Sequence, residues 1–244
     1  MKIGIFDSGI GGLNILSKML VYYPKNSYIY YADNLNMPYG NKSICTIKGA
    51  IIKSMDYFRS INVDIVIIAC NTASTLLGEY VIKNYPFKVY LVTPNLNKAL
   101  GCKKFTLLAT DNTVNYFRAN IDNIAKLNNI TSKELNSKMN IVPSSLLAYL
   151  TEYNAPNFFV NYRYVRDILK NVKKEYPIIL GCTHYTYYKQ YIASLGYECI
   201  SEIDFFNNFD IQKYIKPTDF DNLTFMFTGK RNSKKYLEII NNLL

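Results

Sequence analysis

The chain alternates short apolar runs, rich in β-branched residues, with longer stretches of helical periodicity. Strands separated by helices in this way are typical of parallel sheets. The expected strands cover residues 2–6, 28–32, 65–69, 89–92, 104–109, 178–180 and 224–227. The expected helices cover residues 12–20, 43–60, 73–84, 114–125, 162–173 and 187–194. The pattern therefore predicts an α/β protein with mainly parallel sheets flanked by helices.

Two polar segments interrupt this alternation. The asparagine-rich residues 126–140 indicate an exposed loop or the ragged end of a helix. Residues 204–222 precede the last expected strand, and we expect them to cross from the second half of the chain back to the first.

Two of the apolar runs end in nearly the same way. Residues 64–69 lead into Cys70-Asn71-Thr72, and residues 176–181 lead into Cys182-Thr183-His184, which contains the only histidine of the chain. Ligands of open α/β sheets lie outside the carboxyl ends of the strands, where both motifs fall. The repetition predicts chemistry that needs one thiol on each side of a substrate.

A two-base proton transfer satisfies this requirement. One thiolate removes an α-proton from one face of an amino acid, and a thiol on the other face returns a proton. A Cys–His hydrolase needs one nucleophile and gives no reason for the second cysteine motif. We expect each of the two thiols near a helix N-terminus, where the helix dipole and unpaired N–H groups lower the pKa of a thiol.

The other cysteines carry no such motif. Cys45, Cys102 and Cys199 are expected to be small buried hydrophobic residues. The five cysteines form no C-x-x-C pair and one histidine is too few for the usual zinc patterns, so we expect neither a disulfide framework nor a metal site.

A glycine-rich segment, Asp7-Ser8-Gly9-Ile10-Gly11-Gly12, follows the first expected strand. Its glycines allow close backbone approach, and the helix that follows offers N–H groups to an anion. The spacing is not G-x-G-x-x-G, which argues against dinucleotide binding. Pro38-Tyr39-Gly40 follows the second expected strand and by itself indicates a turn.

Composition limits the partners of the protein. The net charge is +10, but the lysines are scattered and only five arginines are present, so a nucleic-acid partner is not expected. No apolar run approaches the roughly 20 residues of a membrane helix. The chain begins without a signal-peptide pattern, and we expect a cytoplasmic protein with no membrane association.

Taken together, the motifs resemble those of glutamate racemases, within the aspartate/glutamate racemase family. The resemblance rests on Asp7-Ser8-Gly9 with Gly11-Gly12, Pro38-Tyr39-Gly40, Ala69-Cys70-Asn71-Thr72-Ala73-Ser74, Thr110-Asp111-Asn112-Thr113-Val114, Gly181-Cys182-Thr183-His184-Tyr185 and Thr228-Gly229. These segments occur in the order of the family and extend over nearly the whole chain.

The resemblance implies two similar α/β lobes with the active site in the cleft between them. The first lobe comprises residues 1–94 and 206–244, and the second comprises residues 95–205. It further implies racemisation of glutamate without a cofactor, a homodimer, and D-glutamate supplied for peptidoglycan and thus for cell wall biogenesis and cell shape.

Site residues follow from the same resemblance. It implies that Cys70 acts on D-glutamate and Cys182 on L-glutamate, and that Asp7 and His184 adjust the two thiols. Glu152 is a loose match to an assisting glutamate, because its spacing from Pro143 is shifted. The implied substrate-binding residues are Asp7, Ser8, Pro38, Tyr39, Gly40, Asn71, Thr72, Thr113, Thr183 and His184.

Two alternatives stay open from the sequence. One is an aspartate or broad-specificity amino-acid racemase, although His184 favours glutamate because aspartate racemases tend to carry an acidic residue there. The other is a catalytically weak member with a binding role. The chain also departs from the family by having Thr186-Tyr187 in place of Pro-Leu.

Overall fold

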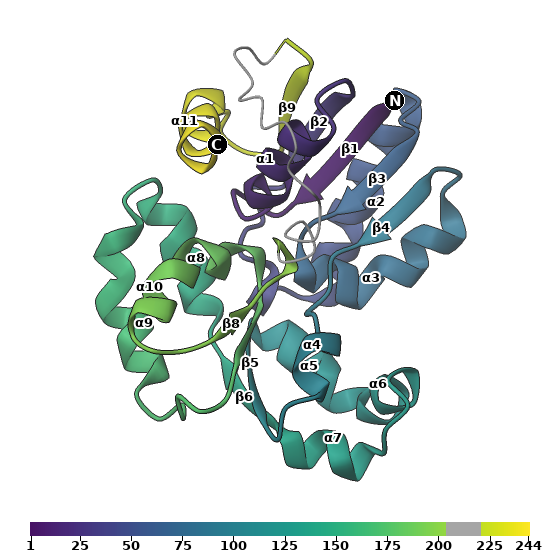
Figure 1. The fold of residues 1–244 in the computed structure, drawn as a ribbon. Coiled ribbons are helices and arrows are strands. Elements are labelled where there is room, and N and C mark those ends of the chain that lie inside the picture. The colour runs from purple at the N-terminus through teal and green to yellow at the C-terminus, as the bar shows by residue number, and fades with distance from the viewer. Residues whose placement is uncertain (204–220) are drawn as a thin grey trace.

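The computed structural model describes residues 1–203 and 221–244, which form two α/β lobes (Figure 1). The first lobe has a five-stranded sheet in the order β4-β3-β1-β2-β9, and the second has a four-stranded sheet in the order β6-β5-β7-β8. Neighbouring strands are parallel in both sheets. The predicted fold class, α/β with parallel sheets flanked by helices, is confirmed.

The first sheet is buried on both faces, as expected of a parallel sheet. Its strands are β1 (Lys2–Asp7), β2 (Ser27–Ala32), β3 (Ile65–Ile68), β4 (Lys88–Leu91) and β9 (Leu223–Phe227). Side chains alternate along β1, so that Ile3 and Ile5 pack on one face and Phe6 packs on the other. The first face is covered by α1 (Leu13–Tyr22) and α11 (Ser233–Leu243), and the second by α2 (Ile44–Ser60) and α3 (Asn71–Asn84).

The second lobe repeats this arrangement around a smaller sheet. Its strands are β5 (Phe105–Ala109), β6 (Met139–Pro143), β7 (Ile178–Gly181) and β8 (Cys199–Ile200). Its helices are α4 (Asn97–Leu100), α5 (Asp111–Ala119), α6 (Ile121–Leu127), α7 (Ser132–Lys138), α8 (Ser145–Asn154), α9 (Tyr162–Leu169) and α10 (Lys189–Ser194). Three short 3-10 helices complete the described elements: η1 (Tyr39–Asn41), η2 (Phe158–Asn161) and η3 (Thr183–Tyr188).

The chain returns to the first lobe at its C-terminal end. Strand β9 pairs with β2, and α11 packs beside α1, so that the yellow segment lies next to the purple one in Figure 1. On this strand membership we propose the division into residues 1–94 plus 206–244 and residues 95–205. The second boundary and most of the expected crossing segment lie outside the described residues.

All seven predicted strands are confirmed, with shifts of one residue at several ends. Strands β6 and β8 were not predicted, and residues 126–140 are not simply a loop, because they hold the end of α6, all of α7 and the start of β6. Strand β6 lies at an edge of its sheet and is only partly buried, so its sequence lacks a strong apolar signal. The predicted helix 114–125 is two helices, α5 and α6, which meet at Asn120.

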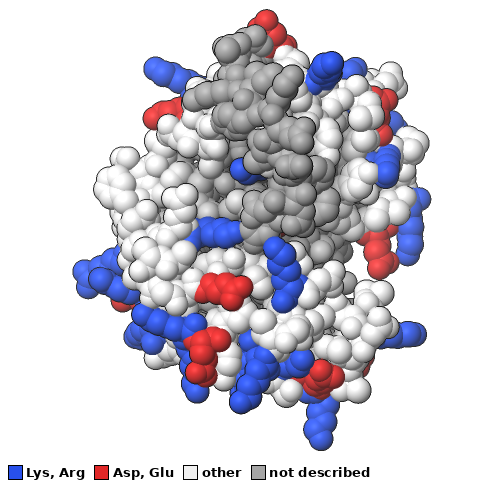
Figure 2. Space-filling model, viewed as in Figure 1, with Lys and Arg blue, Asp and Glu red and all other residues white. Residues whose placement is uncertain are grey.

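The surface has mixed charge. Figure 2 shows Lys and Arg side chains spread over the visible face, with Asp and Glu side chains among them. In residues 1–203 and 221–244, none of the helices combines the length and the apolar character needed to cross a membrane.

A pair of leucine substitutions tests the core of the second lobe. Leu107 is fully buried in β5 between Ile141 and Ile179, whereas Leu127 at the end of α6 is 82% exposed. We expect Leu107→Ala to lower the free energy of unfolding by about 2–5 kcal/mol, because it leaves a cavity. Leu127→Ala should change it by less than about 0.5 kcal/mol. Urea denaturation of both variants provides the measurement, and equal losses would contradict the described packing.

Candidate active site

Three strands bring chemically active side chains to their carboxyl ends. Asp7 is the last residue of β1, Cys70 follows β3 at the start of α3, and Cys182 follows β7 at the start of η3. Ligand sites of open parallel sheets occur at this edge, because the loops and helix N-termini there are free to face a ligand.

Cys70 is buried beside the glycine-rich turn of the first lobe. Its Sγ lies 3.8 Å from Ser8 Oγ. Burial raises the pKa of the Cys70 thiol, and the charges of Asp7 and Cys182 add to the rise, while contacts to the Ala73 N–H and to Ser8 oppose it. The expected lowering of this pKa by the helix N-terminus is therefore wrong, since desolvation exceeds it. The interaction with Cys182 places the two thiols in one electrostatic environment.

Cys182 lies next to a buried histidine and a glutamate. The Cys182 Sγ is 3.9 Å from His184 Nδ1, and His184 Nε2 is 3.1 Å from Glu152 Oε2. Burial by itself lowers the pKa of His184, but its hydrogen bonds to Cys182 and Glu152, together with the charges of Cys182 and Asp7, raise it well above its usual value. The arrangement thus favours an imidazolium between the sulfur and the carboxylate.

Asp7 is fully buried where the two lobes meet. Its Oδ1 accepts a hydrogen bond from the Gly9 N–H at 2.9 Å, and its Oδ2 accepts one from Thr183 Oγ1 of the second lobe at 3.1 Å. Burial raises the pKa of Asp7 to about 6, although the charge of His184 and both hydrogen bonds act in the opposite direction. The carboxyl group therefore titrates near neutral pH.

Glu152 reaches the site from α8. Its Oε2 accepts a hydrogen bond from the Ile10 N–H of the first lobe at 2.7 Å, and Lys235 Nζ of α11 donates to its main-chain oxygen at 2.8 Å. Glu152 therefore contacts His184 even though its spacing in the sequence matches the family only loosely. Glu152 lies on α8, a helix that was not predicted and that begins at Ser145 after the Ser144 N-cap.

Three threonine hydroxyls form a second cluster between the lobes. Thr72 Oγ1 of α3 lies 2.9 Å from Thr110 Oγ1 and 3.3 Å from Thr113 Oγ1, and the latter two are 3.1 Å apart. All three are buried. The neighbouring Asn71 donates through Nδ2 to the Val92 carbonyl, and its buried Oδ1 has no hydrogen-bond partner in the part of the chain that the structure describes.

The turn at residues 38–40 packs tightly against the second lobe. A Cβ atom on Gly40 would lie 2.3 Å from Ser145 Oγ and 2.6 Å from Thr110 Cβ, so glycine is required for this close approach. The Tyr39 hydroxyl donates to Asp33 Oδ2 at 2.5 Å. Pro38 directly precedes η1. The turn therefore lies at the junction of the lobes, with the Tyr39 hydroxyl engaged by a carboxylate that was not predicted.

Hydrogen bonds and electrostatic interactions connect most of the predicted site residues. The connected set comprises Asp7, Ser8, Cys70, Glu152, Cys182, Thr183 and His184. Thr72 and Thr113 belong to the threonine cluster, while Pro38, Tyr39, Gly40 and Asn71 lie on segments next to it. Within the described residues, no cluster of three or more His, Cys, Asp or Glu side chains has the arrangement to hold a metal ion.

The sequence reasoning missed residues that support this set. They are Tyr30, Asp33, Thr110, Tyr187 and Lys235, each of which hydrogen-bonds to a predicted site residue or to the turn after β1. Thr110 directly follows an expected strand, and this position could have predicted that it belongs to the site. Tyr30 gave no such signal, because an aromatic residue in an apolar stretch indicates only the core, whereas Tyr187 was visible as a departure from the family pattern. The three cysteines expected to be buried also differ from expectation, since Cys45 is exposed and Cys102 and Cys199 are only partly buried.

Comparisons with known proteins agree with this geometry. No protein-family model matches the chain. Glutamate racemase 2 of Bacillus subtilis is 33% identical over 206 residues, which are 80% of this chain and 74% of that protein. The glutamate racemase of Halothermothrix orenii is 29% identical and covers 98% of this chain, with 99% of its own length matched.

A solved structure gives the same result for the fold. The crystal structure of glutamate racemase from Francisella tularensis in complex with D-glutamate superimposes with a TM-score of 0.74 at 25% identity, covering 100% of this chain and 93% of that one. Sequence identity above 30% over most of both chains and a shared fold lead to one conclusion: the chain belongs to the glutamate racemase family.

Proposed function

We propose that the protein interconverts L-glutamate and D-glutamate by a two-base proton transfer between Cys70 and Cys182, without a cofactor. The observation that carries the proposal is that the two thiols come from different lobes and interact with one connected group of charges. Cys70 interacts with Cys182 and with the buried Asp7, Asp7 interacts with His184, and the Cys182 Sγ lies 3.9 Å from His184 Nδ1. Family membership supports the same reaction.

The proton balance of the reaction is simple. From L-glutamate, the Cys182 thiolate removes the α-proton and the Cys70 thiol delivers its proton to the opposite face, which yields D-glutamate. Cys182 then carries a proton and Cys70 is a thiolate, so the reverse reaction starts from D-glutamate at Cys70. His184 Nδ1 lies 3.9 Å from the Cys182 Sγ and is the nearest charged partner that the structure gives this thiol.

Buried polar groups support binding and stabilisation of the substrate. The carbanionic transition state gains most from donors that are already oriented, such as the hydroxyls of Thr72, Thr113 and Thr183. The buried Asn71 Oδ1 has no hydrogen-bond partner among the described residues and is an acceptor suited to the substrate ammonium. The proposed binding set keeps Asp7, Ser8, Pro38, Tyr39, Gly40 and His184 as further members.

Glutamate is the proposed substrate, with aspartate as the second candidate. His184 and its Glu152 partner favour glutamate, as the family resemblance implies. We further propose, on the same resemblance, that the enzyme is a cytoplasmic homodimer and that its D-glutamate serves peptidoglycan synthesis.

The first prediction concerns the reaction itself. In D2O without pyridoxal phosphate, the purified protein should exchange the α-proton of L- and D-glutamate and interconvert the two, as measured by NMR and a chiral assay. Neither should occur at a comparable rate with L- or D-aspartate. Absence of exchange with both amino acids would refute the racemase proposal.

The second prediction concerns the two bases. Cys70→Ser and Cys182→Ser should each lower kcat by roughly 10²-fold to 10⁴-fold, because a serine hydroxyl is a far weaker acid than a thiol and does not supply the base. Cys45→Ser is the matched control, since Cys45 is exposed, and it should retain full activity. A variant Cys70→Ser or Cys182→Ser that racemises glutamate at a rate close to that of the wild type would exclude the two-thiol mechanism.

The third prediction uses the pKa of Asp7. Its value of about 6 in the folded protein exceeds the ordinary 3.8, so the folded state binds the proton more tightly. The resulting stabilisation is complete below pH 4 and is lost as the pH rises through 6. Between pH 5 and pH 8 the wild type should therefore lose about 1 kcal/mol more unfolding free energy than Asp7→Asn, which cannot titrate.

Urea denaturation at the two pH values measures this difference. Asp167→Asn is the control, because Asp167 is exposed, and it should follow the pH dependence of the wild type. Asp7→Asn should also lose activity, since it removes the charge that faces His184 and Thr183. An unchanged pH dependence in Asp7→Asn would mean that Asp7 titrates in its ordinary range.

A further inference from the structure

The main-chain N–H and the main-chain carbonyl of Ile10 are both hydrogen-bonded to the second lobe. Its N–H donates to Glu152 Oε2 at 2.7 Å, and its carbonyl accepts a hydrogen bond from the Tyr187 hydroxyl at 2.8 Å. Ile10 belongs to the turn after β1, which also carries Asp7 and Ser8. The second lobe therefore contacts the same short turn that supplies two proposed site residues.

The first lobe holds the same turn at Gly9. The Gly9 N–H donates to Asp7 Oδ1 at 2.9 Å, and the Gly9 carbonyl accepts from the Tyr30 hydroxyl at 2.8 Å. Two adjacent carbonyls are thus bound by two tyrosine hydroxyls, one from each lobe. Tyr30 fixes the turn to its own sheet, whereas Tyr187 fixes it to the opposite lobe.

Tyr187 is itself firmly placed in the second lobe. It lies in η3, five residues after Cys182, and its ring stacks on Phe158 with a centroid distance of 4.2 Å. Its hydroxyl position is therefore tied to the segment that carries the second thiol. The chain has Tyr187 where the family resemblance expects leucine, which has no hydroxyl and could not form this hydrogen bond.

We propose that Tyr187 is a positioning residue that locks the Asp7–Ile10 turn of the first lobe to the Cys182 segment of the second. The inference rests on the proposed function, since two thiols on different lobes must flank one carbon atom. Proton transfer is sensitive to misplacement of about 1 Å, which can reduce a rate roughly 10²-fold. The Tyr187 hydroxyl joins the Cys182 segment to the turn whose Ser8 Oγ lies 3.8 Å from Cys70 Sγ, and it thereby controls that spacing.

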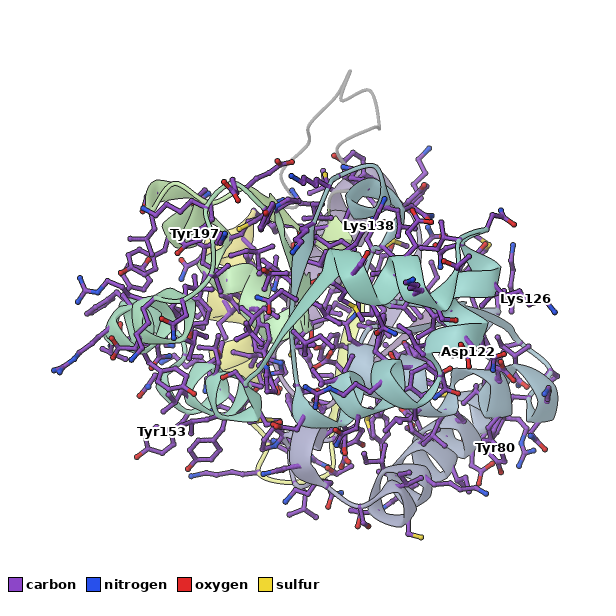
Figure 3. All side chains as sticks on the ribbon, turned by 90° about the horizontal axis from the view of Figure 1, so that it is seen from below. Tyr80, Asp122, Lys126, Lys138, Tyr153 and Tyr197 are labelled. Carbon is purple, nitrogen blue, oxygen red and sulfur yellow. The ribbon has the colours of Figure 1, made fainter. Side chains whose placement is uncertain are left out.

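The test is Tyr187→Phe, which keeps the stacked ring and removes only the hydroxyl. We expect kcat to fall about tenfold in both directions while KM for glutamate changes less than about twofold, because the variant leaves the binding groups in place and disturbs only their alignment for proton transfer. Tyr197→Phe is the matched control, since its hydroxyl donates to the Leu169 and Val172 carbonyls within the second lobe. Figure 3 shows Tyr197 in that lobe.

Hydrogen–deuterium exchange of the segment 8–12 gives a readout that does not need activity. The Ile10 N–H should exchange several-fold faster in Tyr187→Phe than in the wild type, because the turn has lost its carbonyl partner from the second lobe. Tyr197→Phe should exchange at the wild-type rate. Melting temperatures of both variants verify that they fold.

The outcomes separate the inference from the proposed function. A tenfold lower kcat together with faster exchange supports the positioning role, whereas a change in one of them alone, or in neither, overturns it. If the wild type does not racemise glutamate, the proposed function fails. Hydrogen–deuterium exchange of the segment 8–12 by itself then decides whether Tyr187 holds the turn. A drop in kcat of Tyr197→Phe equal to that of Tyr187→Phe would also overturn the inference, since it would show a general packing effect.

Discussion

The arrangement of this protein depends on the hydrogen bonds that the buried Asp7 carboxylate accepts from both lobes. Asp7 ends the central strand β1, accepts a hydrogen bond from its own turn and accepts another from Thr183 of the second lobe. A buried charge is unfavourable unless it is paired, and the electrostatic effect of His184 offsets part of this unfavourable energy. One carboxylate thereby joins the two sheets at the place where both thiols lie.

The burial of the site opposes one step of the proposed reaction, the formation of a thiolate at Cys70. Desolvation raises the pKa of Cys70 and opposes the formation of its thiolate, whereas hydrogen bonds and nearby charges favour an imidazolium at His184. The two thiols thus differ in their surroundings, because Cys182 has the His184 ring as its direct neighbour, whereas the Cys70 Sγ lies next to the Ser8 hydroxyl. The proposed proton transfer between them depends on how glutamate, which brings its own charges, changes this balance when it binds.

Residues outside the sequence motifs hold the lobes in register. Glu152, Tyr187 and Lys235 come from separate elements, and each makes a hydrogen bond between the lobes. The structure therefore depends on a supporting layer of polar contacts behind the motif residues. Such contacts join positions far apart in the chain, for example Ile10 and Tyr187, which no local pattern can relate.

The sequence alone determined the α/β class, the seven principal strands and the positions of Cys70 and Cys182, because buried parallel strands leave a strong apolar signal and motifs at their ends are local. It did not determine the edge strand β6, whose partial burial weakens that signal, nor the helix that brings Glu152 to His184. Only the tertiary structure decided the thiol environment and the Tyr187–Ile10 contact. Desolvation and contacts between lobes depend on all elements that pack around a group, and these come together only when the chain is folded.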